Sequence, residues 1–447
     1  MYNHHKKFFD KFLDFEEKTG LFDLRVKELN IWDHLRYKVY YDLLNLNVSE
    51  DQIRNPNKNN NPRRLIRLFF SLFSFLFFIL FFLPRRNYDL MIIGDGASTN
   101  NNFHPIIEEY SKSNSILVFD ISKKYTPYKK RANADYININ FLVFFRSVFR
   151  SLISFSKEDE RSFKEIASLL KDNFNVDFDS NSLKKDFVQR SYVDYIFYRT
   201  IFKRIHLENI LLCDNGSSKG IFDAAIKSSI KVYDLQHAIV SNYNILYRYK
   251  ESVPSDCIIK ANHILTFGIF WNDKFNLPVE RIPVGYPLME LKKSSSKGNT
   301  ISNFSHLKKD KTFLIISSMR SGRDLENLVL ELANKLNDFH FIYKLRPNEY
   351  SFWKDVYSSD LINKNNIHVI DTNEYHLYDL FKISSYQIGI NSTAILEGIT
   401  FGLRTFILKS GHYLAMSPLI QSEICLYSSV SSILPSLLMR FIAGTLL

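Results

Sequence analysis

The stretch YQIGINSTAILEGITFGLRTFIL, residues 386–408, predicts the fold of the second half of the chain. A short apolar strand runs into Asn-Ser-Thr, where Ser392 and Thr393 occupy positions typical of helix N-caps. The following residues have the apolar spacing of a buried helix, and Gly402 ends that helix before a second strand. A strand, a hydroxyl-rich turn and a helix start suit an anion, although an ordinary capped helix in an α/β domain has the same pattern.

Length and composition indicate a globular chain with more than one domain. The 447 residues are 45% hydrophobic and 23% charged, a balance that supports packed cores and excludes disorder. Cys213, Cys257 and Cys425 are scattered without metal-binding spacing, which argues against structural zinc or disulfides and favours a reducing compartment. The net charge of +11 suits an anionic membrane, phosphorylated substrates or nucleic acid. No nucleic-acid-binding module is found, so we expect no nucleic-acid partner.

An apolar segment near the N-terminus, PRRLIRLFFSLFSFLFFILFFLPRR at 62–86, is a candidate for membrane contact. Residues 68–83 carry no charge, and as a helix they would reach about 24 Å against a hydrocarbon core of about 30 Å. We therefore favour a segment that lies on or in the cytoplasmic leaflet, with a single span and a buried core helix as alternatives. The arginines expected to contact acidic headgroups are Arg63, Arg64, Arg67, Arg85 and Arg86.

Strand and helix patterns alternate along most of the chain, which predicts an α/β fold with two Rossmann-like lobes built on parallel sheets. The predicted strands are 88–93, 115–121, 135–139, 209–213, 231–235, 263–267, 312–316, 340–345, 368–370, 387–390 and 404–408. A polar Ser/Lys-rich stretch separates the two lobes. The predicted domains are an N-terminal helical extension (1–60), the apolar segment (61–87), a first lobe (88–285), a second lobe (286–430) and an apolar tail (431–447).

In the second lobe, cations, hydroxyls and a carboxylate follow successive strands. The carboxyl ends of parallel strands face one crevice, where Arg and Lys can hold phosphate and a carboxylate can accept hydrogen bonds from ribose hydroxyls. Each residue alone also suits a solvated loop or a helix surface. Their ordered recurrence predicts a phosphate and ribose site formed by Arg320, Arg323, Lys344, Arg346, Pro347, Asn391, Ser392, Thr393 and Glu397.

The first lobe offers two candidates for a catalytic base, each directly after an apolar strand. Asp214 lies in the sequence CDNG and His237 in LQHA, and either side chain could take a proton from an acceptor hydroxyl. The alternatives are a turn chosen for its backbone and a buried structural histidine. The residues expected to line the acceptor side of the cleft are Gly94, Asp95, Gly216 and Gln236.

An ordered set of motifs resembles bacterial glycosyltransferases of capsule and O-antigen loci. The motifs are LQHAIVSNYN, LTFGIFWNDKF, IPVGYP, IYKLRPNEY and GINSTAILEGITFG, over about 205–410, and the early helix IWDHLRYKVYYDLL is also similar. The resemblance implies a GT-B fold, with an acceptor lobe first and a donor-nucleotide lobe second, a nucleotide-sugar bound between them, and no cofactor or obligatory metal. More distantly, the chain resembles bacterial sialyltransferases, Kdo transferases and teichoic-acid glycerophosphotransferases, which use CMP- or CDP-linked donors.

Two positions depart from the family pattern. Ala238 stands where glycine is usual, and Arg346 stands where the family has the histidine of a His-Pro pair. An arginine can bind phosphate bidentately but cannot donate a proton at neutral pH, so a mechanism that needs a protonated histidine does not transfer.

The sequence therefore predicts a glycosyltransferase that moves a sugar from a nucleotide-sugar to a lipid-linked or growing glycan in bacterial surface-polysaccharide synthesis. Asp214, or else His237, would deprotonate the acceptor hydroxyl. The alternatives are a transferase with CMP- or CDP-linked donors (sialic acid, Kdo or glycerol phosphate), a nucleotide-sugar epimerase, and a non-catalytic polysaccharide assembly protein. We expect the chain on the cytoplasmic side of the inner or plasma membrane, peripheral or monotopic, with a single span as the alternative.

Overall fold

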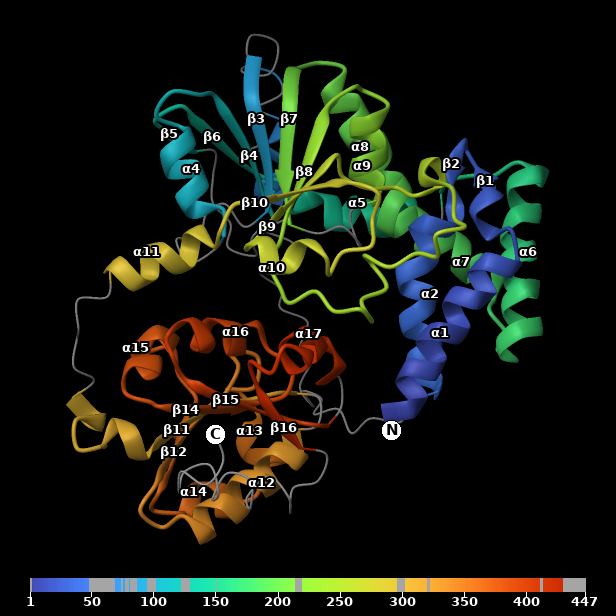
Figure 1. The fold of residues 1–447 in the computed structure, drawn as a ribbon. Helices are drawn as coiled ribbons and strands as arrows, with labels where there is room; N and C mark the ends of the chain where they lie inside the picture. Colours follow the sequence, from blue (N-terminus) through green and yellow to red (C-terminus); the bar gives the residue numbers. More distant parts are fainter. Residues whose placement is uncertain are drawn as a thin grey trace.

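The structure contains two parallel sheets, one above the other in Figure 1, and a group of helices beside the upper sheet. It is a computed structural model. The helix α11 (Pro287–Ser295) follows the last strand of the upper lobe and leads into the lower one. The described residues are 2–47, 69–73, 75–76, 80, 87–94, 102–121, 129–150, 152–213, 219–295, 302–319, 322–410 and 413–428.

The first lobe is built on an eight-stranded sheet in the order β10-β9-β8-β7-β3-β4-β6-β5. All neighbours are parallel except β5 and β6, which are antiparallel. The strand order reverses direction between β3 and β7, so the loops after these two strands flank a crevice. The strands are β3 (Asn87–Gly94), β4 (Ile116–Asp120), β5 (Lys129–Arg131), β6 (Ala134–Asn138), β7 (His206–Leu212), β8 (Lys231–Leu235), β9 (His263–Thr266) and β10 (Glu280–Pro283).

The second lobe is a six-stranded, fully parallel sheet in the order β13-β12-β11-β14-β15-β16. Relative to chain order this is 3-2-1-4-5-6, the doubly wound arrangement whose switch point lies between β11 and β14. Both lobes are thus Rossmann-like, as expected. The strands are β11 (Thr312–Ile316), β12 (His340–Lys344), β13 (Ile367–Ile370), β14 (Tyr386–Gly389), β15 (Arg404–Leu408) and β16 (Leu426–Ser428).

Helices connect the strands of both sheets, as the alternating pattern predicts. The first lobe has α4 (His104–Tyr110), α5 (Phe141–Phe149), α8 (Val193–Phe202), α9 (Lys219–Ile226) and α10 (Ile269–Asn272). The second lobe has α12 (Gly322–Lys335), α13 (Trp353–Val356), α14 (Asp360–Asn363), α15 (Leu377–Lys382), α16 (Thr393–Thr400) and α17 (Ser417–Gln421). The last helix before β7 is α8, which ends at Phe202, and β7 begins four residues later at His206.

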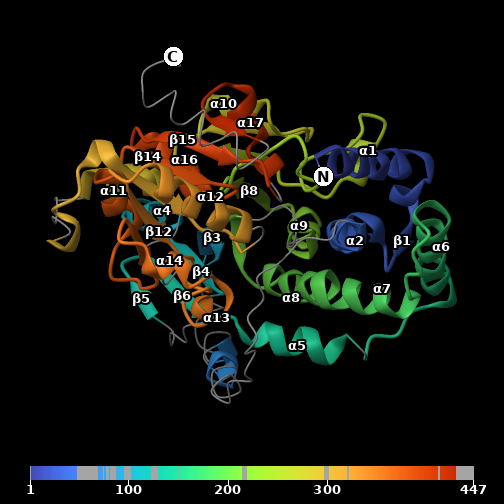
Figure 2. The ribbon, with the colours of Figure 1, turned by 90° about the horizontal axis from the view of Figure 1, so that it is seen from below.

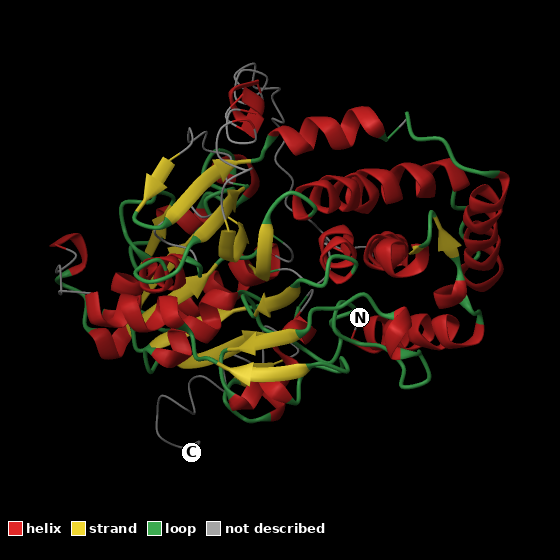
Figure 3. Ribbon diagram, turned by 90° about the horizontal axis from the view of Figure 1, so that it is seen from above, coloured by secondary structure: helices red, strands yellow, loops and turns green. Residues whose placement is uncertain are grey.

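The N-terminal helices do not stand apart from the rest of the chain. The helices α1 (Tyr2–Lys18) and α2 (Ile31–Asn47) pack beside α6 (Lys157–Phe174) and α7 (Ser180–Phe187), which are inserted between β6 and β7 (Figures 1 and 3). Aromatic rings form the interface: Phe174 lies 5.0 Å from Phe15 and 6.1 Å from Phe12, measured between ring centroids. Two stretches of chain that are distant in sequence therefore make one helical subdomain.

A buried charge network joins this subdomain to the first lobe. The carboxylate of Asp33 on α2 accepts hydrogen bonds from Lys219 Nζ (3.0 Å), Tyr249 Oη (2.7 Å) and the backbone N–H of Ile259 (2.7 Å). Asp33 is 2% exposed and Lys219 is 3% exposed. Burial alone raises the pKa of Asp33, but the positive charges of Lys219 and Arg36 outweigh it and hold this pKa below its usual value.

A second pair extends the network. Glu16 on α1 accepts from Arg36 Nε at 2.6 Å and from Trp32 Nε1 at 2.7 Å. Arg36 in turn donates to the backbone carbonyls of Ile245 and Arg248, in the long loop that follows β8. Trp32, Asp33 and Arg36, in the sequence IWDHLR, therefore fix the position of this loop as well as of α2.

The apolar segment is described only at residues 69–73, 75–76 and 80, and each of these residues is helical. Phe75 is 5% exposed and packs on Phe141 and Phe197, with ring centroids 4.7 and 5.2 Å away. Within the described residues, no helix combines the length and apolar character that crossing a membrane requires. The flanking arginines Arg63, Arg64, Arg67, Arg85 and Arg86 lie outside the described residues.

Replacing Asp33 with Asn should lower the free energy of unfolding by about 3–5 kcal/mol, because Lys219 would remain buried without its counter-charge. Urea denaturation followed by circular dichroism measures the change. The control is Lys335→Gln, which breaks an exposed pair with Glu331 on α12 and should cost at most about 1 kcal/mol. Equal losses in the two variants would contradict the structural role of the buried pair.

Candidate functional site

The switch point of the second sheet brings together the loops after β11 and β14. Ser318, directly after β11, donates a hydrogen bond of 3.4 Å from Oγ to Oδ1 of Asn391, directly after β14. Ser392 is the N-cap of α16, and its side chain accepts from the backbone N–H of Ala394 at 3.3 Å. The start of α16 therefore adjoins the crevice in which doubly wound sheets bind ligands.

A glycine allows α16 to approach the sheet this closely. A Cβ atom at Gly389 would lie only 2.6 Å from the side chain of Ile395 on α16, well inside van der Waals contact. The strand therefore ends in glycine so that the first turn of α16 can pack directly on β14. The predicted order of a strand, an Asn-Ser-Thr turn and a helix is confirmed here.

The loop after β12 carries Arg346 into the same crevice. Its Nε donates to the backbone carbonyl of Ser317 at 3.1 Å, across from β12 to β11. Glu349, which is completely buried, accepts from the Arg346 backbone N–H (2.8 Å), from Ser317 Oγ (2.8 and 2.9 Å) and from Tyr357 Oη (2.8 Å). Among the described residues, no carboxylate lies within ion-pair distance of the Arg346 guanidinium. Its charge thus faces the crevice from a rigidly held loop.

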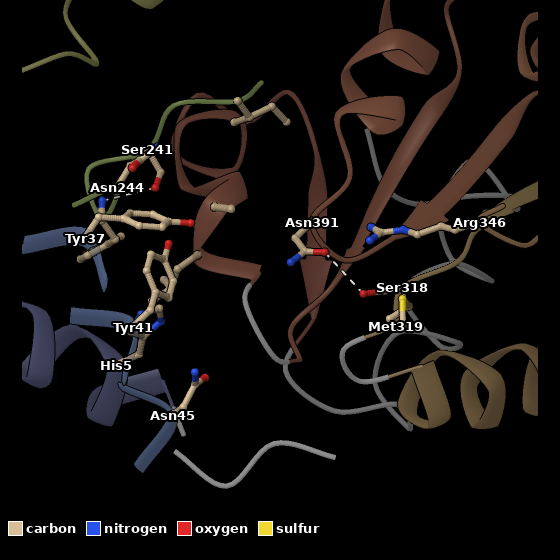
Figure 4. A pocket seen from close by; sticks show the side chains of 14 residues that line it. His5, Tyr37, Tyr41, Asn45, Ser241, Asn244, Ser318, Met319, Arg346 and Asn391 are labelled. Carbon is tan, nitrogen blue, oxygen red and sulfur yellow. Dashed lines mark hydrogen bonds between the residues drawn. The ribbon is translucent and has the colours of Figure 1, made fainter. Parts of the chain in front are cut away.

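A cavity of about 660 Å³ lies between the lobes at this point. Figure 4 shows the guanidinium of Arg346 pointing toward Asn391, with Tyr37 and Tyr41 of α2 on the opposite wall. The rings of these tyrosines are 4.8 Å apart, measured between centroids. The cavity is therefore bounded by both lobes and by the N-terminal helices. The lining residues are His5, Tyr37, Tyr41, Asn45, Ile239, Ser241, Tyr243, Asn244, Ser318, Met319, Arg346, Asn391, Leu414 and Ala415.

Glu397 lies one turn into α16 and contacts the connection between the lobes. Tyr286, next to the interlobe helix α11, donates a hydrogen bond of 2.9 Å to Glu397 Oε1 and stacks on Phe267 at 4.2 Å. Burial raises the pKa of Glu397, and hydrogen bonds from Tyr286 and Tyr378 partly offset the increase. A half-buried carboxylate held by two phenols is a hydrogen-bond acceptor directed at the interlobe connection.

Lys344 ends β12 on the same edge of the sheet. Its ammonium donates to Tyr350 Oη at 2.5 Å and to the backbone carbonyl of Thr372 at 2.7 Å. Burial lowers the pKa of Lys344 to about 8, although the charge of Asp371 acts in the opposite direction. Burial also lowers the pKa of His376, and the charges of Lys292 and Lys344 add to this effect. Cationic and aromatic groups thus gather beside the strand ends.

The other predicted residues have more varied surroundings. The side-chain amide of Gln236 is held within its own lobe, donating to the carbonyl of Ala238 (3.0 Å) and accepting from the N–H of Phe267 (2.8 Å). His237 is exposed at the end of β8 and is therefore not a buried structural histidine. A Cβ at Gly94 would lie 2.2 Å from the ring of Phe103, so this glycine allows close packing.

Some predicted positions lie away from the crevice contacts or outside the described residues. Arg323 is exposed in the first turn of α12, and Pro347 is exposed beside Arg346. Thr393 is the half-buried first residue of α16. The predictions that fall outside the described residues are Asp95, Asp214, Gly216 and Arg320.

Several residues of the crevice were not predicted. Tyr37 and Tyr41 come from α2, where mixed apolar and basic residues at helical spacing do not reveal that one face lines a cavity. Glu349 follows Arg346 by three residues, and that spacing was the one available signal for a carboxylate that organises the loop. Tyr286 lies in the motif IPVGYP, and nothing in that motif indicates that its side chain bonds Glu397.

Comparison with known proteins gives a limited result. No family model and no curated protein sequence matches the chain. Among solved structures, UDP-GlcNAc 2-epimerase from Neisseria meningitidis bound to UDP-GlcNAc is similar, with 15% identity, a TM-score of 0.45, and coverage of 79% of this chain and 91% of that one. A UGT transferase from Siraitia grosvenorii in complex with UDP is also similar, with 11% identity, a TM-score of 0.46, and coverage of 80% of this chain and 92% of that one. The Rossmann-like arrangement of both lobes follows from their own strand order.

Glu349→Gln should lower the free energy of unfolding by about 1–3 kcal/mol, because an amide would place N–H groups against donors in a site sealed from water. Urea denaturation measures this loss. The control is Glu331→Gln on the exposed face of α12, which should be nearly neutral. If the two variants were equally stable, Glu349 would not organise the loop of Arg346.

Proposed function

We propose that the protein is a glycosyltransferase of GT-B type. It transfers a sugar from a nucleotide-sugar to a lipid-linked or growing glycan. The product belongs to a bacterial surface polysaccharide, either capsule or O-antigen. The observation that carries the proposal is the convergence of Arg346, Asn391 and the capped start of α16 at the switch point of the second sheet. Arg346 and Asn391 line a cavity whose other wall is aromatic and belongs to the first lobe and the N-terminal helices, and Ser392, the N-cap of α16, follows Asn391 directly.

The donor nucleotide would bind along the carboxyl edge of the second sheet. Arg346 and Lys344 supply positive charge for its phosphates, and the N-terminal turn of α16 adds backbone N–H groups. Glu397 would accept hydrogen bonds from the ribose hydroxyls, with Tyr286 and Tyr378 holding its carboxylate in place. The nucleotide would therefore contact the interlobe connection, and its sugar would extend into the cavity.

The acceptor sugar would occupy the side of the cavity formed by Tyr37, Tyr41 and Tyr243. Aromatic faces pack on the apolar side of sugar rings, while their hydroxyls and the nearby Asn244 can bond sugar hydroxyls. The volume of about 660 Å³ lies within the usual range for small-ligand sites, about 300–1,000 Å³.

Transfer would proceed by direct displacement. A base on the first lobe, Asp214 or the exposed His237, takes the proton of the acceptor hydroxyl, and the resulting oxygen nucleophile bonds to the anomeric carbon of the sugar. The bond from that carbon to the phosphate oxygen breaks, and the nucleotide leaves with the electron pair. Arg346 stabilises the charge that grows on the departing phosphate but supplies no proton, because a guanidinium stays protonated at neutral pH.

A lipid-linked acceptor would require the enzyme to work at the cytoplasmic face of the inner or plasma membrane. The uncharged run at 68–83, with arginines on both sides, supports a peripheral or monotopic attachment. In this arrangement the two hydroxyl-bearing substrates would reach the cavity from different directions, the nucleotide-sugar from solution and the glycan from the bilayer.

Binding of UDP, GDP, CMP and CDP to the purified full chain, measured by calorimetry, tests the donor site first. One nucleotide class should bind, and Glu397→Ala and Lys344→Ala should each weaken it about tenfold or more, the cost of losing a charged hydrogen bond. The control is Glu331→Ala on α12, which should bind normally.

The other outcomes select the alternatives. Selective binding of CMP or CDP would favour a transferase of sialic acid, Kdo or glycerol phosphate. Isomerisation of the nucleotide-sugar without an acceptor would favour an epimerase. A well-folded protein that binds no nucleotide would contradict the proposal and favour a non-catalytic assembly role.

Nucleotide affinity should also depend on pH through Lys344. Its pKa of about 8 means that the ammonium is charged below pH 8 and neutral above it, and phosphate binds the charged form. Affinity should therefore stay level between about pH 6.5 and 7.5 and fall by up to about tenfold for each pH unit above 8. In Lys344→Arg the side chain stays charged, so the decline should disappear. The same decline in both proteins would show that Lys344 does not contact the phosphate.

A further inference from the structure

We propose that the outward face of α5 and the helical residues 69–73, 75–76 and 80 form one surface that docks on an anionic lipid bilayer. The proposed function calls for membrane contact near the apolar run, but it assigns no role to α5. The inference therefore adds α5 as a second element of the membrane contact. Its test does not depend on any sugar chemistry.

The sequence of α5, FLVFFRSVF, gives the helix two apolar sides. Phe141 and Leu142 face the core and are 4% and 3% exposed. On the other side, large apolar side chains face water, and a soluble surface rarely collects so many in one short stretch. These are Val143, Phe144, Val148 and Phe149, followed by Leu152, with exposures of 36%, 50%, 38%, 38% and 68%.

The described residues 69–73, 75–76 and 80 continue this surface. Ser71 Oγ accepts from the N–H of Phe141 at 3.3 Å and donates to the carbonyl of Asn138 at 2.9 Å, which fixes the segment against the start of α5. In Figure 2 the short blue helical piece lies beside α5, in agreement with these two hydrogen bonds. The exposed apolar side chains here are Phe69, Phe70, Phe73, Leu76 and Leu80, which are 46–71% exposed.

The charge pattern favours lipid over a protein partner. The stretches 62–86 and 141–156 contain no Asp or Glu, while arginines lie at both ends of the apolar run and at Arg146 and Arg150 in α5 and its cap. Arg146 is paired with Asp194 (2.7 and 2.8 Å), and Arg150 is exposed. The exposed cation of Arg150 lies at the end of this apolar face, and an apolar face beside a positive charge matches acyl chains below a layer of acidic headgroups.

Co-sedimentation of the full chain with vesicles tests the proposal. Vesicles of phosphatidylethanolamine with phosphatidylglycerol should bind the protein, and vesicles of phosphatidylcholine alone should bind it several-fold less. The double variant Phe144→Glu/Val148→Glu should lose about tenfold or more of its binding to the anionic vesicles, because carboxylates would face the headgroups. The matched control is Ile362→Glu on α14 of the second lobe, where an isoleucine is 49% exposed, and it should bind like the unaltered protein.

Each other result overturns the inference. Failure of the unaltered protein to bind anionic vesicles would contradict the proposal. Equal binding by the double variant would contradict it as well. A concentration-dependent dimer in light scattering, abolished by the double variant, would assign the face to a second copy of the chain instead. Nucleotide binding is measured on the same samples: its retention shows that the double variant is folded, and its absence in every sample would count against the enzyme proposal while leaving the vesicle result intact.

Discussion

The desolvated carboxylate of Asp33 is the constraint on which the rest of the molecule depends. A carboxylate that has been removed from water must be matched by donors, and here the donors come from α9, from Tyr249 and from the backbone at Ile259. Through Arg36 the same network reaches the loop after β8, which carries Ser241, Tyr243 and Asn244 to the cavity. The aromatic wall opposite Arg346 is thus positioned by charged side chains that do not themselves line the cavity.

Much of the fold could be predicted because parallel sheets bury both faces of their strands. The strands β8, β11 and β15 have the predicted bounds, since each is a short, mostly apolar run between turn residues. Strands at the sheet edges have no such signal: β5 is Lys-Lys-Arg and exposed throughout, and β10 is Glu-Arg-Ile-Pro with no buried residue. The pairing of α1 and α2 with helices inserted much later in the chain was not predictable, because helical periodicity shows which face is apolar but not what covers it.

The site was predictable to the extent that topology determines it. Arg346 and Asn391 follow strands whose carboxyl ends had to share an edge, and both line the cavity. Glu397 and Lys344 lie along the same edge but interact with Tyr286, Tyr378 and Tyr350, contacts that depend on side-chain geometry and on the path between the lobes. A residue such as Tyr37, contributed by a distant helix, carries no local mark of its role.

The union of α1 and α2 with later segments has a consequence for how the protein is made. Arg36 donates to the carbonyl of Arg248, a residue 212 positions further along the chain. At about 5–20 residues per second, a ribosome needs roughly 10–40 s to supply that partner. During this interval the aromatic side chains of α1, including Phe9 and Phe12, lack the neighbours that bury them in the finished fold. The helices α1 and α2 are therefore translated well before the partners that secure them, and chaperones have that interval in which to bind them.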